Sequence, residues 1–449
     1  MRIEIPDNAG RIVELLEGSG HEAYLVGGWV RDSLLGRPGS DIDIATDAKA
    51  DETTRIMEDA GVTVHPTGVR HGTVTAVVDG EPFEITTFRV DGSYSDSRHP
   101  DSVSFCQSIE DDLSRRDFTI NAIAYNPRTG IVDPYGGRED LGAHLIRCVG
   151  DPDRRFGEDA LRIMRALRFS AQLGFQIEDG TSRGLVEHRQ LLKSISAERV
   201  GRELGLLIVE DAAADVLEGY TPVFETIIPE IAPTIGMDQH NPLHAFDVWG
   251  HCTQAVRMQK SHDLATRLAT LFHDLGKPLV EDPSRGKFRF AGHAEAGADL
   301  CERALRRLRF PKKVIEDASA AIRAHDIRFD DEDTDVRRWL GKLGADTFFR
   351  TLDLKEADIL AHSPEVAHWA EHIQDIRELA REVLASGEPY RVQDLAIDGS
   401  DLIEAGFEPG PDIGRALDEL LEAVISGDCV NGRQELLGYA SGLRGQRPG

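Results

Sequence analysis

The sequence predicts an α/β domain over residues 1–150, followed by helices nearly to the end of the chain. Between residues 1 and 150, short segments with alternating apolar residues, typical of strands, lie between helical segments. From about residue 151 the apolar residues recur every three to four positions, which is the period of a packed helix. Because 449 residues are too many for one compact core, we expect several domains.

The expected division is an α/β head over 1–150, a helical neck over 151–220, a helical body over 221–375 and a helical tail over 376–449. Stretches rich in Gly and Pro near 228–242 and 388–411 mark plausible boundaries. In the head we expect, in order, a helix over 8–19, a strand over 23–26, a Gly-Gly turn, a helix over 29–35, and strands over 41–45, 72–78 and 82–89.

The composition is that of a globular protein, with 40% hydrophobic residues and charges of both signs. No apolar run approaches the ~20 residues that a membrane span needs, and the acidic, amphipathic start is unlike a secretory signal. The five cysteines are scattered without a CxxC pair, which favours reduced thiols in the cytoplasm. Nothing in the sequence indicates a membrane or an obligate protein partner.

The net charge of −28 has two interpretations. In the first, the chain does not bind nucleic acid, because the phosphates of nucleic acids favour basic proteins. In the second, the acidic surface is an adaptation to salt, and basic residues are confined to a few local surfaces. Only nine of the 51 basic residues are lysines, and this arginine bias favours adaptation to salt. The local basic spots are Arg115-Arg116, Arg154-Arg155, Arg162, Arg165, Arg168 and the stretch over 303–313.

A pair of carboxylates on an expected strand is the most informative feature. Asp41 and Asp43 are two residues apart, so on a strand their side chains share one face. Mg²⁺ relieves the repulsion of such a pair and prefers few carboxylates together with substrate phosphates. Upstream, Gly27-Gly28 joins a strand to a helix, where backbone N–H groups suit a triphosphate and Arg31 can add a charged hydrogen bond.

These residues resemble the nucleotidyltransferase superfamily that includes DNA polymerase beta. The patterns GGxVRDxLLG at 27–36 and DxDxxT at 41–46 resemble more closely the class II tRNA nucleotidyltransferases and the bacterial poly(A) polymerases. The resemblance implies a polymerase-beta-like head with a small mixed sheet, Mg²⁺ as cofactor, Asp41 and Asp43 as its ligands, and Asp32 in the nucleotide site. Glu84 is the candidate third acidic ligand, and a solvent-facing glutamate is the alternative.

Two arginine motifs continue the resemblance. The segment RRDFTINA at 115–122 is similar to the family motif that places Arg116 at the triphosphate and Asp117 and Asn121 at the sugar hydroxyls.

In GEDALRIMR, residues 157–165, we expect one helix that brings Glu158, Arg162 and Arg165 to one side with Asp159 on the flank. The family pattern EDxxR implies that Asp159 and Arg162 bind the Watson–Crick edge of the incoming C or A. Arg165 and Arg168 are implied phosphate contacts.

The resemblance implies addition of C, C and A to the 3′ end of tRNA from CTP and ATP. GVRHGTVTAVV at 68–78 replaces the arginine-rich segment of poly(A) polymerases. A long polar stretch between Arg89 and Arg116 resembles the flexible loop of CCA-adding and A-adding members, which leaves addition of A alone as an alternative. Residues 395–431 resemble the family's C-terminal segment, which suggests a tRNA-binding tail.

A histidine constellation follows in the body. His251, His273-Asp274 and Asp358 occur in the order of the HD phosphohydrolase family, and His293 and His325-Asp326 add possible ligands. Imidazole and carboxylate suit Mn²⁺, Fe²⁺, Ni²⁺ or Zn²⁺, and a metal-bound hydroxide could attack a phosphate ester such as a 2′,3′-cyclic phosphate. The alternative is that the body only binds tRNA. An HD phosphohydrolase with an inactive head and a non-catalytic RNA-binding protein are the competing functions.

Overall fold

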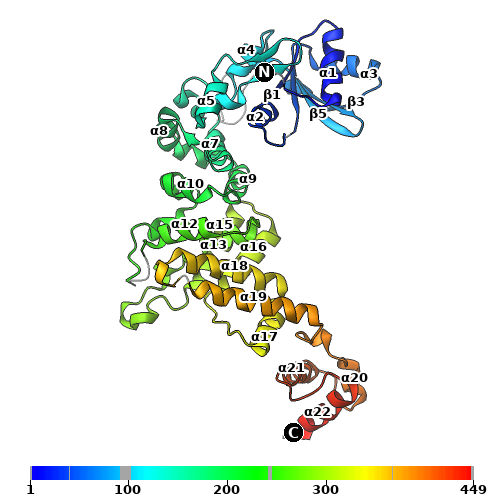
Figure 1. Cartoon of the computed structure of the whole chain (residues 1–449), viewed down its shortest axis with the longest axis vertical. Coiled ribbons are helices and arrows are strands. Elements are labelled where there is room, and N and C mark those ends of the chain that lie inside the picture. The colour runs from blue at the N-terminus through cyan, green and yellow to red at the C-terminus, as the bar shows by residue number, and fades with distance from the viewer. Residues whose placement is uncertain (1–2, 40, 92–102, 241–244, 367, 446–449) are drawn as a thin grey trace. The chain divides into compact units, whose positions relative to one another are not determined.

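The computed structural model describes residues 3–445 except 40, 92–102, 241–244 and 367. The chain divides into two compact units, Met1–Pro229 and Glu230–Gly449. The first unit carries the main sheet and the helices that follow it, and the second is helical (Figure 1). The predicted fold class, an α/β head followed by helices, is confirmed.

A seven-stranded mixed sheet forms the centre of the head, in the order β3-β4-β5-β2-β1-β8-β9. Only the pairing of β2 with β5 is parallel among these neighbours. The strands are β1 (Ala23–Val26), β2 (Asp43–Thr46), β3 (Thr63–Gly68), β4 (Thr73–Val78), β5 (Glu81–Thr87), β8 (Ala124–Asn126) and β9 (Gly130–Val132). The strand expected over 41–45 therefore begins two residues late, at Asp43.

Apolar periodicity explains how the helices cover this sheet. In α1 (Asp7–Gly18) the buried side chains of Ala9, Ile12, Val13 and Leu16 follow the helical period. That helix contacts α3 (Ala50–Asp59), which also packs against β3, β4 and β5. Alternate residues of β4 are buried, so one face of the strand meets the core.

The first unit continues with short elements. They are α2 (Gly28–Leu34), η1 (Val69–His71), α4 (Ile109–Ser114), η2 (Thr119–Asn121), α5 (Gly137–Ala143), α6 (Pro152–Glu158), α7 (Leu161–Leu173), α8 (Asp179–Glu187), η3 (Arg189–Ser194), α9 (Ala197–Ile208), α10 (Ala213–Gly219) and α11 (Thr221–Ile227). Two ribbons pair β6 (Arg89–Asp91) with β7 (Val103–Phe105) and β10 (Leu145–Ile146) with β11 (Gln176–Ile177). The flexible loop expected between Arg89 and Arg116 lies partly outside the described residues, at 92–102.

The second unit contains helices throughout. After η4 (Pro229–Thr234), they are α12 (Val248–Met258), α13 (Leu264–Phe272), α14 (Lys277–Val280), η5 (Pro283–Phe288), α15 (His293–Arg307), α16 (Lys312–Ala324), α17 (Asp333–Leu343), α18 (Ala345–Ala361), η6 (Pro364–Val366), α19 (Trp369–Ser386), η7 (Val392–Asp394), α20 (Gly399–Glu404), α21 (Pro411–Ile425) and α22 (Arg433–Gly445). One core is built around Phe329, Leu340 and Phe348, and a separate core in the last helices around Leu402, Leu420 and Leu436.

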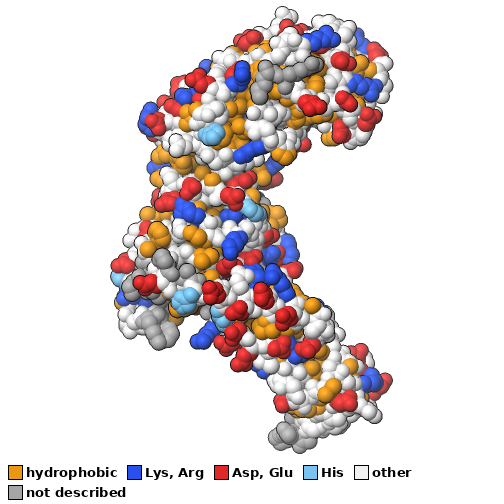
Figure 2. All heavy atoms as spheres, in the orientation of Figure 1, with side chains coloured by type: hydrophobic (Ala, Val, Ile, Leu, Met, Phe, Trp, Pro, Cys, Tyr) orange, Lys and Arg blue, Asp and Glu red, His pale blue; other side chains and the backbone are white. Residues whose placement is uncertain are grey.

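The surface mixes the two signs of charge. Figure 2 shows acidic and basic side chains next to each other over much of the face that it draws. Among the described residues, no helix combines the length and the apolar character needed to cross a membrane. All five cysteines are free thiols.

Candidate functional site

A tight turn between β1 and α2 opens the site in the head. Gly27 adopts φ 76° and ψ −138°, a conformation that favours glycine. A Cβ atom there would lie 3.0 Å from Nη1 of Arg116 and 3.8 Å from Oδ2 of Asp43. The turn therefore brings the backbone of Gly27, which directly precedes α2, close to a guanidinium and to one of the predicted metal ligands.

Three carboxylates meet beside this turn. Asp43 begins β2 and is the register partner of Glu84 on the parallel strand β5, so the two side chains lie on one face of the sheet. Asp41 precedes the strand and is exposed, so the sequence prediction that both aspartates lie on the strand is wrong for Asp41. Burial raises the pKa of Asp43 to about 6; Arg116 opposes the shift, while Glu84 and Asp41 add to it. The three acidic groups thus repel one another, which is what a divalent cation relieves.

Arg116 links this acidic group to α4. Its Nη2 lies 3.5 Å from Oδ2 of Asp112, a carboxylate of which 1% of the side chain is exposed. Asp112 also pairs with Arg115 at 2.9 Å. Burial lowers the pKa of Arg116, and Asp112 counteracts this. Sequence reasoning missed Asp112, although its position four residues before Arg116 is the spacing of a helical ion pair.

A hydrogen-bonded chain connects the residues predicted at the sugar and the triphosphate. Arg31 donates to both carboxylate oxygens of Asp32, at 2.8 and 3.0 Å, and to Oδ1 of Asn121 at 2.9 Å. Asn121 donates to Asp117 at 3.1 Å, and Arg165 donates to the same carboxylate at 2.8 Å. Burial by itself raises the pKa of Asp117, but Arg165 and Asn121 outweigh it and bring the pKa to about 2. These five side chains, predicted from separate motifs, form one network.

The EDxxR segment is not one helix, contrary to the sequence prediction. Helix α6 ends at Glu158 and α7 begins at Leu161, because Asp159 is extended, with φ −139° and ψ 102°. Oδ1 of Asp159 accepts from the backbone N–H of Leu161 at 3.0 Å and so caps α7. Its Oδ2 accepts from Nη2 of Arg199 on α9 at 3.1 Å. Sequence reasoning missed Arg199, which lies on α9, 40 residues after Asp159.

Arg162 and Arg168 are also held by acidic partners. Arg162 donates to Glu158 at 2.8 Å and to the backbone carbonyls of Arg155 and Arg115 at 3.1 and 3.0 Å. Arg168 donates to Glu203 on α9 at 2.6 Å. The sequence therefore identified the cations, and the structure adds the carboxylates and carbonyls that orient them.

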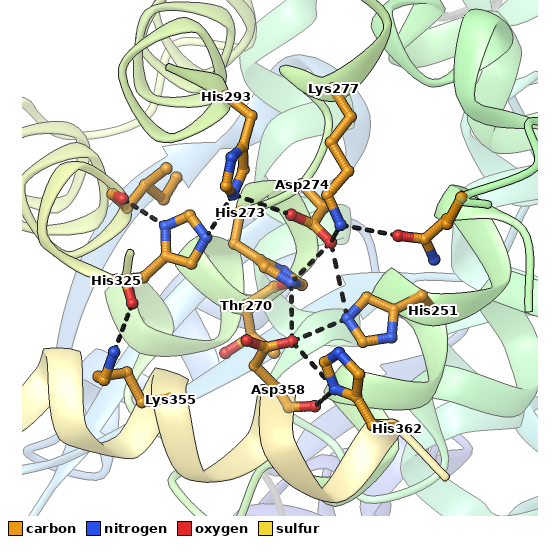
Figure 3. Close-up of polar contacts among 12 residues, drawn as sticks. His251, Thr270, His273, Asp274, Lys277, His293, His325, Lys355, Asp358 and His362 are labelled. Atoms are coloured by element: carbon orange, nitrogen blue, oxygen red, sulfur yellow. Dashed lines mark hydrogen bonds and ion pairs between the residues drawn. The ribbon is translucent and has the colours of Figure 1, made fainter. Parts of the chain in front are cut away.

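The second unit contains a buried cluster of histidines and aspartates (Figure 3). Two groups of three residues have ligand atoms within 4.8 Å of one another: His251, His273 and Asp358, and Asp274, His293 and His325. They come from α12, α15, α18 and the ends of α13 and α16. All four predicted HD residues are thus brought together with the additional histidines. Asp326 is exposed and belongs to neither group.

Asp274 lies between the two groups. Its Oδ2 is 3.6 Å from Nε2 of His251 and 3.4 Å from Nε2 of His273. Its Oδ1 is 3.4 Å from Nε2 of His293. Burial opposes ionisation of Asp274, but Lys277 and His273 outweigh it and hold the pKa of Asp274 well below the usual range. One carboxylate thus offers an oxygen to each group, as a bridging metal ligand does.

Backbone contacts orient the imidazole rings. Nδ1 lies within hydrogen-bond distance of a backbone carbonyl in His273 (2.8 Å), His293 (3.0 Å) and His325 (2.6 Å). With the proton on Nδ1, the Nε2 lone pair is left for the cluster, as in metal-binding histidines. Burial, followed by the charges of His273 and His293, lowers the pKa of His325 to about 3, so this ring is neutral near pH 7. The donor set fits divalent transition metals.

Two further side chains border the cluster. Lys277 pairs with Asp274 and with Gln239, whose Oε1 lies 2.7 Å away. His362, four residues after Asp358, lies with its ring 4.7 Å from that of His251. Sequence reasoning missed both, although the helical spacing to Asp358 was a signal for His362.

Three family profiles match the chain. They are the poly(A) polymerase head domain over residues 23–147, the probable RNA- and SrmB-binding site of polymerase A over 174–234, and the putative domain 2 of tRNA nucleotidyltransferase over 293–440.

Curated relatives and solved structures match over nearly the full length. The CCA-adding enzyme of Lactobacillus helveticus is 35% identical, with 98% of each chain covered, and that of Geobacillus stearothermophilus is 34% identical, with 95% of each covered. The crystal structure of the Bacillus stearothermophilus CCA-adding enzyme in complex with CTP is 31% identical and superimposes with a TM-score of 0.70, covering 98% of each chain. The Thermotoga maritima CCA-adding enzyme complexed with tRNA, 19% identical, shares the fold with a TM-score of 0.61, covering 97% of this chain and 94% of that one. Identity above 30% over nearly the whole of both sequences shows that this chain belongs to the family of CCA-adding enzymes, with a polymerase-beta-like nucleotidyltransferase head.

Proposed function

We propose that this chain adds C, C and A in turn to the 3′ end of tRNA, using CTP and ATP and no nucleic-acid template. The observation that carries the proposal is the meeting of Asp43, Glu84 and Asp41 beside the Gly27 turn and Arg116. Acidic groups in this position suit Mg²⁺, and the turn and the guanidinium suit a triphosphate. Membership of the CCA-adding family supplies the substrate class.

In this proposal Asp41, Asp43 and Glu84 hold Mg²⁺. Bound there, the metal supplies activation of the 3′-hydroxyl and neutralisation of charge on the departing pyrophosphate. Arg116, which Asp112 holds over the Gly27 turn, binds the triphosphate, and Arg31 supports it from α2. Asp117 and Asn121 serve the ribose hydroxyls, because a carboxylate accepts and an amide both donates and accepts.

Base choice is assigned to Asp159 and Arg162. C and A both present an exocyclic amine on the Watson–Crick edge, and a carboxylate accepts from it, whereas G and U present an oxygen there. Arg162 can donate to a ring nitrogen or a carbonyl oxygen of the same edge. Arg199, which already contacts Asp159 at 3.1 Å, would hold the carboxylate in place. Arg165 and Arg168 serve the phosphates.

The decisive experiment uses three tRNAs truncated before the first C, before the second C and before the final A. Purified protein with Mg²⁺, CTP and ATP should complete all three ends, which separates CCA addition from addition of CC or of A alone. Asp41→Ala together with Asp43→Ala should abolish extension without lowering the melting temperature. Extension by the double variant would refute the metal assignment, and extension of the last tRNA alone would identify an A-adding enzyme.

We also propose that the second unit holds a divalent-metal centre with phosphohydrolase activity. The observation that favours it is the pair of three-residue groups joined by Asp274, with three imidazole rings oriented by backbone carbonyls. His251, His273 and Asp358 would hold one ion, and Asp274, His293 and His325 would hold a second. A metal in such a site supplies a hydroxide nucleophile at neutral pH.

Metal content tests this second function. After reconstitution with Mn²⁺, Ni²⁺, Fe²⁺ or Zn²⁺ and desalting, mass spectrometry should find up to two ions per chain. The single variant His293→Ala should remove one ion per chain. The single variant His273→Ala should reduce the metal content by more than His293→Ala does. His372→Ala, which alters a histidine on α19 outside the cluster, should change nothing. A 2′,3′-cyclic phosphate at an RNA end is the substrate to assay. Absence of retained metal from the wild-type protein would exclude the centre.

A cytoplasmic location fits this function. Because all five cysteines are free, a reducing compartment with tRNA is the expected setting.

A further inference from the structure

A single aromatic ring lies among three arginines of the nucleotide site. The guanidinium carbons of Arg31, Arg165 and Arg168 are 5.0, 5.2 and 4.1 Å from the centroid of the Phe169 ring. Phe169 is 5% exposed, and Phe118 meets it at 5.9 Å with the ring planes at 84°. The three cations come from α2 and α7, which are more than 120 residues apart in the sequence.

Three like charges around one ring repel each other unless something compensates. Each guanidinium has its own carboxylate partner: Asp32 for Arg31, Asp117 for Arg165 and Glu203 for Arg168. These partners come from α2, from the segment after α4, and from α9. All three cations lie against the Phe169 ring, whose negative π-face attracts them.

The ring also limits where the arginines can move. Hydrogen bonds hold the edges of the guanidinium groups: besides their carboxylates, Arg31 donates to Asn121 and Arg168 donates to Gln172 at 3.1 Å. The Phe169 ring lies directly beside the guanidinium groups of Arg31 and Arg165, and Phe118 contacts it with the ring planes nearly perpendicular. Because Asn121 joins Arg31 to Asp117, a shift of one arginine is passed to the other.

We propose that Phe169 is a positioning residue that fixes the spacing of Arg31, Arg165 and Arg168 for the incoming nucleoside triphosphate. This inference rests on the proposed nucleotidyl transfer. Because Phe169 is 5% exposed, it acts through the three cations that surround it. Loss of the ring therefore weakens nucleotide binding more than it slows the chemical step.

The test compares Phe169→Leu with Phe169→Tyr, which keeps the aromatic face. Phe169→Leu should raise KM for CTP and for ATP by about tenfold while kcat stays within about twofold. Phe169→Tyr should restore KM to within about twofold of the wild-type value. Phe175→Leu is the matched control, because Phe175 is a buried aromatic residue of the same unit whose ring stacks on His144 at 4.8 Å.

Calorimetric binding of CTP with Mg²⁺ separates this inference from the proposed function. If the wild-type protein binds CTP but does not extend tRNA, the function fails, while weaker binding by Phe169→Leu still supports the positioning role. If Phe169→Leu does not fold, as judged by circular dichroism, Phe169→Met takes its place. An unchanged KM and Kd in the aliphatic variant, or an equal rise in Phe175→Leu, would overturn the inference.

Discussion

The buried position of Asp43 makes its negative charge unfavourable for the stability of the folded protein. Burial raises its folded-state pKa to about 6 from the ordinary 3.8, so the folded protein binds this proton more tightly than the unfolded chain does. The free energy of unfolding therefore falls as pH rises from about 4 to about 6, and the full penalty remains above that range. A divalent cation bound to Asp43, as proposed above, would offset the penalty because it favours the ionised carboxylate.

Removing this charge should stabilise the protein. In Mg²⁺-free buffer at pH 7.5, Asp43→Asn should raise the free energy of unfolding by on the order of 1–3 kcal/mol. The gain should vanish near pH 4, where the wild-type carboxyl is protonated. Asp41→Asn, which alters an exposed carboxylate, is the control and should change stability little. Thermal melts at both pH values measure the effect, and a less stable Asp43→Asn at pH 7.5 would contradict it.

The choice of the incoming base also depends on a single side chain in our proposal. Asp159→Ala removes the acceptor to which we assign recognition of the exocyclic amine of C and A, so discrimination against UTP and GTP should fall by about tenfold or more. The ratios of kcat/KM for the four nucleotides measure it. Asp153→Ala is the control, because that exposed carboxylate of α6 pairs with His188 instead. If the Asp159 variant rejects UTP and GTP as strongly as the wild type, the base is chosen elsewhere.

At the scale of elements, a close approach of two backbones assembles the histidine cluster. A Cβ at Gly276 would lie 2.2 Å from the carbonyl oxygen of His293, and one at Gly297 would lie 2.8 Å from that of His273. The start of α14 and the helix α15 can meet only because both positions lack a side chain. This contact brings His293 to the turn that carries His273 and Asp274.

Gly297→Ala should therefore push α15 away from that turn. We expect a loss of stability of about 1–3 kcal/mol, as for overpacking, and a fall in metal content by about one ion per chain. Gly414→Ala on α21 is the control, since an added Cβ there meets nothing within 4 Å and alanine favours a helix. Retention of the full metal content by Gly297→Ala would show that α15 does not need this contact.

The sequence predicted those helices, strands and turns that depend on residues close together in the chain. The helix at α1, the strands at β1, β4 and β5 and the Gly-Gly turn follow from periodicity and from turn residues. The break at Asp159 does not, because the apolar period continues through it and the carboxylate that caps α7 is held by Arg199, 40 residues later. The three-residue strands β8 and β9 depend on pairings that the sequence does not show, since β8 pairs with β1 and β9 pairs with β8.

The same limit applies to the sites. Residue types and motif spacing predicted the cations and carboxylates of the head, as well as the four HD residues. Among their partners, Asp112 had a local signal, because it lies four residues before Arg116. Arg199 and Glu203 had none of this kind, because both reach the site from α9. The ion pairs with these carboxylates also change how the arginine clusters in the sequence are interpreted. A guanidinium that already holds a carboxylate contributes orientation to the site and little net positive charge.

For the whole molecule, the net charge of −28 is therefore carried by acidic groups that the arginines do not balance. Such an excess destabilises the folded state through self-repulsion, which salt screens. We expect the melting temperature to rise with KCl, mostly below about 0.3 M, where the Debye length shortens most. Stabilisation by exclusion of salt from the surface would instead continue to grow at molar concentrations.

Binding of tRNA should respond in the opposite direction. Phosphate contacts release counterions, so KM for tRNA should rise linearly with salt on logarithmic axes over the range in which the protein gains stability. Melts and initial rates in one KCl series from about 0.02 to 1 M measure both effects. A melting temperature that is flat below 0.3 M would refute self-repulsion. A KM for tRNA that does not change with salt would mean that shape and stacking hold the tRNA and that few phosphates are neutralised. In that case the acidic surface would have little effect on tRNA binding.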